Sequence, residues 1–127
     1  MSLKLNAPAV GGVLTTFITM SDAQDEIDWE ILGGRKTGAT TNIFYKGIPE
    51  YGIHSTFGAI PNDGTIEGSH VYSIDWTRKS IIFSIDDVVV RTYLNDANAV
   101  SPATPAGQKW FPNTPSRVQF AIWFVLE

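Results

Sequence analysis

Alternation of polar and apolar side chains is the most regular pattern in this chain, and it is clearest over Asp25–Leu32. Carboxylates alternate there with large apolar residues: Glu26, Asp28 and Glu30 against Ile27, Trp29 and Ile31. Successive side chains of a β-strand point to opposite faces. The segment is therefore predicted to be a strand with one acidic face and one face that packs in the core, with Trp29 on the core side.

Further segments with strand patterns are separated by Gly, Pro, Asp and Asn. They are Leu3–Leu5, Val13–Met20, Thr41–Lys46, His70–Trp76, Ile81–Ile85, Val88–Leu94 and Ser116–Leu126. The short turn Ser21–Gln24 predicts a hairpin with the acidic strand, and the three segments from His70 to Leu94 predict a meander. Residues 47–68 and 95–114 are expected to be long loops. Because no amphipathic helical window is longer than two turns, the pattern predicts an all-β sandwich.

Chain length and charge limit the classes of protein that fit. A chain of 127 residues is long enough for one domain with a real core, over residues 1–127, and too short for two. The net charge of −4 and the pI of about 5.0 favour neither a nucleic acid nor an anionic membrane as partner. The absence of cysteine excludes disulfides and thiolate metal sites. The sequence has neither an apolar run of transmembrane length nor the features of a signal peptide.

The three carboxylates of the acidic strand are the main candidates for catalysis. The Cα atoms of Glu26 and Glu30 are expected about 13 Å apart on a strand, and side chains that lean together bring their carboxyls to about 5–6 Å, as in retaining glycosidases. In that hypothesis Glu26 is the nucleophile, Glu30 is the acid/base with a pKa raised by its acidic neighbours, and Asp28 modulates them.

Two other interpretations of the same acids stay open. The first is an ordinary solvated strand face. The second is a calcium site, which the straight strand disfavours because it spreads its oxygen ligands along a line. We therefore predict no metal and no cofactor.

Polar and aromatic residues on several strands are candidates for substrate binding. They are Asn42, Phe44, Trp76, Arg117, Gln119 and Trp123. Sugars stack on aromatic rings, so Trp76 and Trp123 are candidate platforms, with core packing as the alternative for each. Arg117 and Gln119 share a strand face with Trp123 and are candidate donors to sugar hydroxyls, or else exposed polar residues.

Two isolated histidines do not fit a hydrolytic triad. Neither His54 nor His70 has a neighbouring Ser and Asp in a triad order. His70 is expected to begin a strand and to bond a loop backbone or a substrate hydroxyl, and His54 is expected in a loop that borders a cleft.

The string DEIDWEILG, Asp25–Gly33, resembles the active-site signature of glycoside hydrolase family 16, in the variant whose acids alternate on a regular strand. Other segments resemble that family in the same order along the chain: Gly12–Met20, Thr41–Gly47, His70–Trp76, Ile82–Asp87 and Phe111–Gln119. The resemblance covers nearly the whole chain and is closest to fungal members, including cell-wall transglycosylases of the Crh type.

This resemblance implies a jelly-roll sandwich with a concave cleft and a retaining mechanism on β-linked glucans, β-1,3 or β-1,4, with glucan–chitin cross-linking as one form. By position it implies Glu26 as nucleophile, Asp28 as assisting acid and Glu30 as acid/base. It implies that Trp76 and Trp123 face the cleft. It also implies a polysaccharide or oligosaccharide partner and an extracellular or cell-wall location. The sequence does not separate hydrolysis from transglycosylation.

Domains of this family are typically sandwiches of about 200–250 residues, so the chain resembles about the middle half to two-thirds of one and is expected to be a truncated member. The strands expected before Leu3 and after Trp123 are absent. Missing strands leave unpaired edges, which predicts self-association. A second hypothesis is therefore a catalytically silent glycan-binding module or a non-functional fragment.

Overall fold

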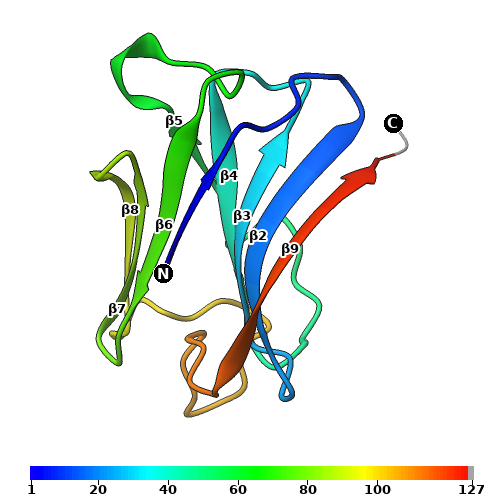
Figure 1. The fold of residues 1–127 in the computed structure, drawn as a ribbon. Helices are drawn as coiled ribbons and strands as arrows, with labels where there is room; N and C mark the ends of the chain where they lie inside the picture. The colour runs from blue at the N-terminus through cyan, green and yellow to red at the C-terminus, as the bar shows by residue number, and fades with distance from the viewer. Residues whose placement is uncertain (126–127) are drawn as a thin grey trace.

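Two antiparallel β-sheets pack face to face in the computed structural model of this chain, which describes residues 1–125 (Figure 1). One sheet has the strand order β1-β6-β7-β8 and the other β5-β4-β3-β2-β9. The elements are β1 (Ser2–Leu5), β2 (Val13–Ser21), β3 (Glu26–Leu32), β4 (Gly38–Phe44), β5 (Thr56–Ala59), the 3₁₀ turn η1 (Pro61–Asp63), β6 (His70–Trp76), β7 (Ser80–Ile85), β8 (Val88–Leu94) and β9 (Ser116–Phe124). The predicted all-β sandwich, the β2–β3 hairpin and the β6–β7–β8 meander are confirmed.

The core lies between the sheets, and Trp29 of β3 joins the two layers. Its ring is fully buried and meets Tyr72 and Phe83 of the opposite sheet edge-on, with ring centroids 5.4 Å and 5.6 Å away. Its indole N–H donates to the carbonyl of Ser73 at 3.1 Å. Because the isoleucines of β3 are buried on the same side, the acidic face of the strand is turned away from the core.

Two segments differ from the expectation based on the sequence. The predicted loop over residues 47–68 contains η1 and β5, and β5 pairs with β4. β5 has four residues and includes Gly58, so its sequence carries no periodic strand pattern. The strand forms because it pairs with β4. The strand predicted over residues 41–46 ends at Phe44, because Lys46 has a φ of 51° and its N–H donates to Asp25.

β9 is an edge of the five-stranded sheet and, among residues 1–125, pairs with β2 alone (Figure 1). Apolar side chains on one face of β9 continue the buried face of β2, yet each is more than half exposed: Val118, Phe120, Ile122 and Phe124. The strand predicted here was expected to reach Leu126, which lies outside the described residues. An uncovered apolar face beside an unpaired strand edge favours association.

We expect this chain to self-associate through β9. Replacing Phe120 and Ile122 together with threonine keeps strand-forming side chains but removes much of the apolar face, so the chain should move toward the monomer in size-exclusion chromatography with light scattering. Ala121→Thr, on the opposite face of the same strand, is the matched control. Self-association that is unchanged by the double substitution contradicts this expectation.

Candidate active site

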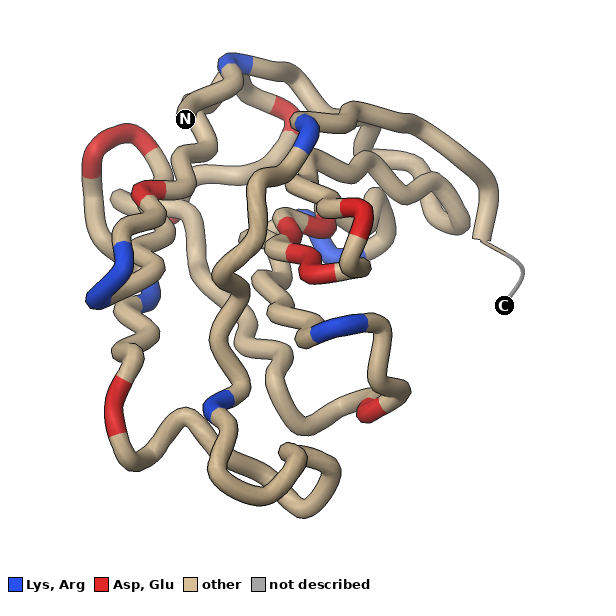
Figure 2. The backbone as a smooth tube through the Cα atoms, turned by 90° about the horizontal axis from the view of Figure 1, so that it is seen from below, with Lys and Arg blue, Asp and Glu red and all other residues tan. Residues whose placement is uncertain are grey.

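The acidic face of β3 opens onto a cavity of 710 Å³, called the acidic cavity from here on. Glu26 and Glu30 line it, and Asp28 lies between them on the same strand face but is only 1% exposed. Figure 2 shows one group of acidic backbone positions near the middle of the view from below, with other acidic and basic positions spread over the rest of the chain. The fold therefore presents two accessible carboxyls on either side of a buried one.

Asp28 is a buried carboxyl that receives no N–H or hydroxyl donor from any described residue. Burial is the largest cause that raises the pKa of Asp28 well above its usual range, followed by a hydrogen bond with Glu26 and the negative charges of Glu26 and Glu30. Adjacent carboxyls do not all ionise together. The raised pKa favours the protonated form of Asp28, and in that form the carboxyl can donate a hydrogen bond to a flanking glutamate.

The pKa of Glu30 is raised as well. Burial is the largest cause and the negative charge of Glu26 the second, while hydrogen bonding with Asp28 opposes them. The direction predicted from the sequence is confirmed, although burial rather than charge is the main cause. An upward shift of the pKa is the direction that a carboxyl acting as general acid needs.

Five of the six candidate substrate-binding residues lie on the acidic face of the five-stranded sheet. Phe44, Arg117 and Trp123 line the acidic cavity. Asn42 is the β4 neighbour of Asp28, and Gln119 lies two strands away from Asp28, beyond β2. The fold thus brings these residues from β4 and β9 to either side of the acidic strand.

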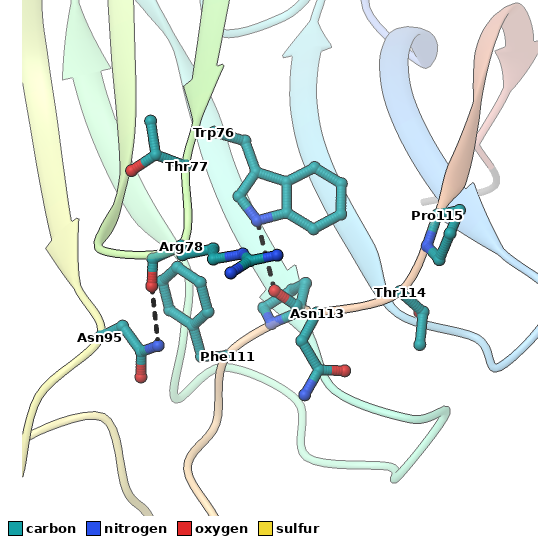
Figure 3. A pocket seen from close by; sticks show the side chains of 9 residues that line it. Trp76, Thr77, Arg78, Asn95, Phe111, Asn113, Thr114 and Pro115 are labelled. Atoms are coloured by element: carbon teal, nitrogen blue, oxygen red, sulfur yellow. Dashed lines mark hydrogen bonds between the residues drawn. The ribbon is translucent and has the colours of Figure 1, made fainter.

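Trp76 is the candidate that the fold does not bring to the acids. It lies on β6 of the four-stranded sheet, and its indole N–H donates to the carbonyl of Pro112 at 3.2 Å. It lines a different cavity, shown in Figure 3. The two sheets therefore separate it from Glu26 and Glu30.

Tyr51 lines the acidic cavity without having been assigned a role from the sequence. It is 80% exposed and meets Phe44 edge-on, with ring centroids 6.0 Å apart. Trp123, more than half exposed, contributes a second aromatic ring to the same cavity. An exposed aromatic residue in a loop rich in glycine and proline was the available signal for Tyr51.

Asp25, directly before Glu26, is a second residue that sequence reasoning missed. It is fully buried, and its carboxylate accepts bonds from the Lys46 N–H at 3.0 Å, the Asn113 N–H at 3.0 Å, and the Thr114 N–H and hydroxyl at 3.2 Å and 2.6 Å. Its own N–H donates to the Ser21 hydroxyl at 2.9 Å. Asp25 thus ties the β2–β3 turn, the end of β4 and residues 113–114 together behind Glu26. The available signal was its position on the apolar side of the alternation.

Glu50 and His54 form a buried pair next to the wall of the acidic cavity. Their side chains are 8% and 6% exposed, with 2.5 Å between His54 Nε2 and Glu50 Oε1. The Ser101 hydroxyl and the Ala103 N–H also donate to the Glu50 carboxylate. The loop that carries His54 borders the acidic cavity, as expected, and the His54 ring stacks on Trp110 with ring centroids 4.2 Å apart. The pair therefore fixes the chain on either side of the exposed Tyr51.

His70 occupies the strand start where it was expected. Its ring nitrogens contact the Asp86 carboxylate at 2.6 Å and the Thr65 carbonyl at 2.8 Å. Of the two partners predicted for it, the loop backbone is the one found.

The Glu50 cluster should make stability depend on pH. Burial alone raises the pKa of Glu50, but the hydrogen bonds from Ser101, His54 and Ala103 outweigh burial and lower it. A lowered folded pKa contributes stability that is complete above the ordinary Glu value of about 4.3 and is lost as the pH falls through the folded value. The Tm difference between the wild type and Glu50→Gln should therefore be largest near pH 7 and shrink toward about pH 3.

The control for this measurement is Glu67→Gln, because Glu67 is an exposed glutamate paired with Lys36 on the surface. Its Tm difference from the wild type should stay small at every pH. A Glu50→Gln difference that is constant with pH, or that grows in acid, contradicts the expectation.

Within residues 1–125, no group of three or more His, Asp or Glu side chains is arranged to hold a metal ion. The same part of the chain contains no helix that is long and apolar enough to cross a membrane.

The two-sheet fold and the acidic strand agree with a known protein family. The sequence model of the family Glycosyl hydrolases family 16 matches residues 1–125. The chain belongs to that family, and the resemblance inferred from its sequence is confirmed.

Fungal Crh-like proteins are among its relatives. The chain is 32% identical to Crh-like protein 2 of Aspergillus fumigatus over 97% of its own length, and 40% identical to Crh-like protein UTR2 of Candida albicans over 89%. These matches cover 27% and 23% of the two relatives. The chain therefore spans about a quarter of the length of these relatives.

Solved structures agree with the predicted jelly roll. A Crh5 transglycosylase in complex with NAG superposes with a TM-score of 0.81 at 34% identity, covering 97% of this chain and 47% of that one. A Bacillus licheniformis β-glucanase gives a TM-score of 0.75 at 22% identity over 97% of this chain and 51% of the other, and it supports the fold alone.

Proposed function

We propose that this chain carries the acidic strand of a retaining glycosidase or transglycosylase that acts on β-linked glucans. The observation that carries the proposal is the arrangement on β3: Glu26 and Glu30 line one cavity and flank the buried Asp28, whose pKa is raised by burial and by its acidic neighbours. Membership of glycoside hydrolase family 16 and the likeness to a Crh5 transglycosylase support it.

In the first step, Glu26 attacks the anomeric carbon as the bond to the departing oxygen breaks. Glu30, which has a raised pKa, donates its proton to that oxygen, so the departing sugar leaves as an alcohol and a glycosyl ester forms on Glu26. A protonated Asp28 donates a hydrogen bond to Glu26. This bond stabilises the negative charge on Glu26 before the attack and after its release.

In the second step, Glu30 is ionised and removes a proton from the incoming hydroxyl. The oxygen of that hydroxyl attacks the anomeric carbon, the ester bond breaks and Glu26 leaves as a carboxylate. Water as the acceptor gives hydrolysis, and a sugar hydroxyl gives transglycosylation. The aromatic rings of Tyr51, Phe44 and Trp123 provide apolar surfaces on which sugar rings can stack beside the acids.

The proposed substrates are β-1,3- or β-1,4-linked glucans, with chitin oligosaccharides as candidate acceptors. The relative solved with NAG supports an acceptor of that kind. Arg117, Gln119 and Asn42 are proposed to bond sugar hydroxyls. We place the enzyme outside the cell or in the cell wall, where such polymers occur.

A time course of product release tests this function. The chain is incubated with laminarin oligosaccharides or mixed-linkage glucan, with and without chitin oligosaccharides, and the products are separated by size. Shortened products indicate hydrolysis, and products longer than the donor indicate transglycosylation. Absence of both over a long incubation contradicts the proposal.

The second candidate is a glycan-binding module without catalytic activity. It is favoured by the open edge at β9, which leaves Trp123 more than half exposed beside the acids. This candidate predicts retention on glucan together with no product in the same time course.

A further inference from the structure

A second cavity, of 560 Å³, lies near the turn between β6 and β7. We call it the Trp76 pocket. Trp76 and Arg78 line one side of it, and residues 111–115, which lead into β9, line the other (Figure 3). Within residues 1–125, the Trp76 pocket and the acidic cavity share no lining residue. The proposed catalytic residues therefore leave this pocket unused.

The apolar wall of the Trp76 pocket is held in place before any ligand arrives. The indole N–H of Trp76 bonds the Pro112 carbonyl at 3.2 Å, which fixes the orientation of the ring. Phe111 is 4% exposed and stacks on Tyr93, with ring centroids 6.1 Å apart and planes 8° from parallel. A wall that is already ordered loses little conformational entropy on binding.

Two polar side chains at the rim of the pocket have no hydrogen-bond partner among the described residues. The Arg78 guanidinium and the Asn113 amide are exposed, and neither makes a side-chain hydrogen bond to another described residue. In Figure 3 both side chains lie below the Trp76 indole. Both side chains can donate hydrogen bonds to the hydroxyl groups of a ligand that rests on the aromatic wall, and the Asn113 amide can also accept them.

Charge selects the class of ligand. Arg78 is the one charged residue among those that line the pocket. The backbone N–H groups of Asn113 and Thr114 already donate to Asp25 and are therefore not available to an anion. An anion would find Arg78 as its single cationic partner here, whereas a neutral, hydroxyl-rich ring can use the aromatic wall together with the Arg78 and Asn113 side chains.

We propose that the Trp76 pocket is a second glycan-binding site, which holds one ring of a neutral polysaccharide against Trp76 and bonds its hydroxyls through Arg78 and Asn113. The identity of the glycan as a β-glucan rests on the proposed function. The site itself does not depend on catalysis, because none of its residues touches the acids of β3.

The test measures retention on insoluble β-1,3-glucan, with Glu26→Gln as the background so that the polymer is not degraded. The double substitution Arg78→Ala with Asn113→Ala should weaken retention by roughly tenfold, as the loss of one recognition element does. Trp76→Ala should weaken retention at least as much. Lys79→Ala, which changes the exposed neighbour of Arg78 in the same turn, is the matched control and should leave retention unchanged.

A second measurement separates this site from the acidic cavity. With Glu26 intact, the Arg78 and Asn113 double variant should turn over a short soluble glucan oligosaccharide within about twofold of the wild-type rate, because the acidic cavity alone holds a short substrate. Its Tm should equal that of the wild type, since both changed side chains are exposed.

Retention that is unchanged in the folded double variant overturns the proposal, as does absence of retention in the parent chain. If the wild type shows no turnover but the double variant loses retention, the second site stands and the proposed catalytic function fails. If turnover is present and retention does not depend on these residues, the catalytic function stands and the second site fails.

Discussion

Glu26→Gln is expected to lower turnover of a glucan oligosaccharide by on the order of 10³-fold or more. Glutamine has nearly the same shape as glutamate, but its amide oxygen is a poor nucleophile, so the glycosyl ester cannot form. The fold should persist, because Glu26 lines a cavity and is not part of the buried core. Initial rates of product release and far-UV circular dichroism measure the two effects.

The matched control is Glu67→Gln, which makes the same chemical change at an exposed surface pair. Its turnover should equal that of the wild type. A Glu26→Gln rate within about tenfold of the wild type removes Glu26 from the nucleophile role.

Glu30→Gln separates the two carboxyl roles within the same experiment. An aryl glycoside whose phenol leaves without protonation bypasses a general acid, so this variant should form the glycosyl ester at a nearly normal rate. An added small anion such as azide should then restore product release, because it needs no base. Neither the aryl glycoside nor azide should rescue the activity of Glu26→Gln. If the two variants respond alike to both, Glu26 and Glu30 do not have distinct roles.

Asp25→Ala is expected to cost about 3–5 kcal/mol of unfolding free energy. The substitution leaves the buried N–H groups of Lys46, Asn113 and Thr114 without their acceptor. It also removes one of the two bonds of the Thr114 hydroxyl, which keeps its bond to the Ser21 hydroxyl, so three chain segments lose a common attachment point. Denaturant unfolding followed by fluorescence measures the loss.

Asp22→Ala is the matched control for Asp25, because Asp22 is an aspartate in the same turn whose side chain is 92% exposed and pairs with Arg117 on the surface. Its stability should be nearly unchanged. Asp25→Asn should fall between the two, since one oxygen remains but an amide N–H₂ faces backbone donors. Equal stability of Asp25→Ala and Asp22→Ala contradicts the structural role given to Asp25.

Local periodicity made the acidic strand and its buried partner face predictable. Trp29 had to be internal because it alternates with carboxylates, and it is fully buried against Tyr72 and Phe83. β9 was predictable for the same reason, since its two faces differ in polarity along nine residues. These features depend on neighbours in sequence.

The missed features depend on contacts between distant segments. β5 forms only because β4 offers it an edge, and Asp25 bonds residues 88 and 89 positions away along the chain. Trp76 shares the core-facing side of β6 with Tyr72 and Ile74 and packs against the core, in the sheet opposite the acids. Assignment of a strand to a sheet is a tertiary property, so the sequence pattern did not place Trp76 correctly with respect to the acids.

The positions of the four tryptophans give this chain a set of built-in optical probes. Trp29 reports on the contact between the sheets, Trp110 on the stack with His54, Trp76 on the second pocket and Trp123 on the acidic cavity. An exposed indole emits at longer wavelength than a buried one, so the fluorescence of Trp123 and that of Trp29 differ in emission maximum. Single Trp→Phe variants thus assign a fluorescence change to one place in the molecule, and sugar titrations can be followed without any added label.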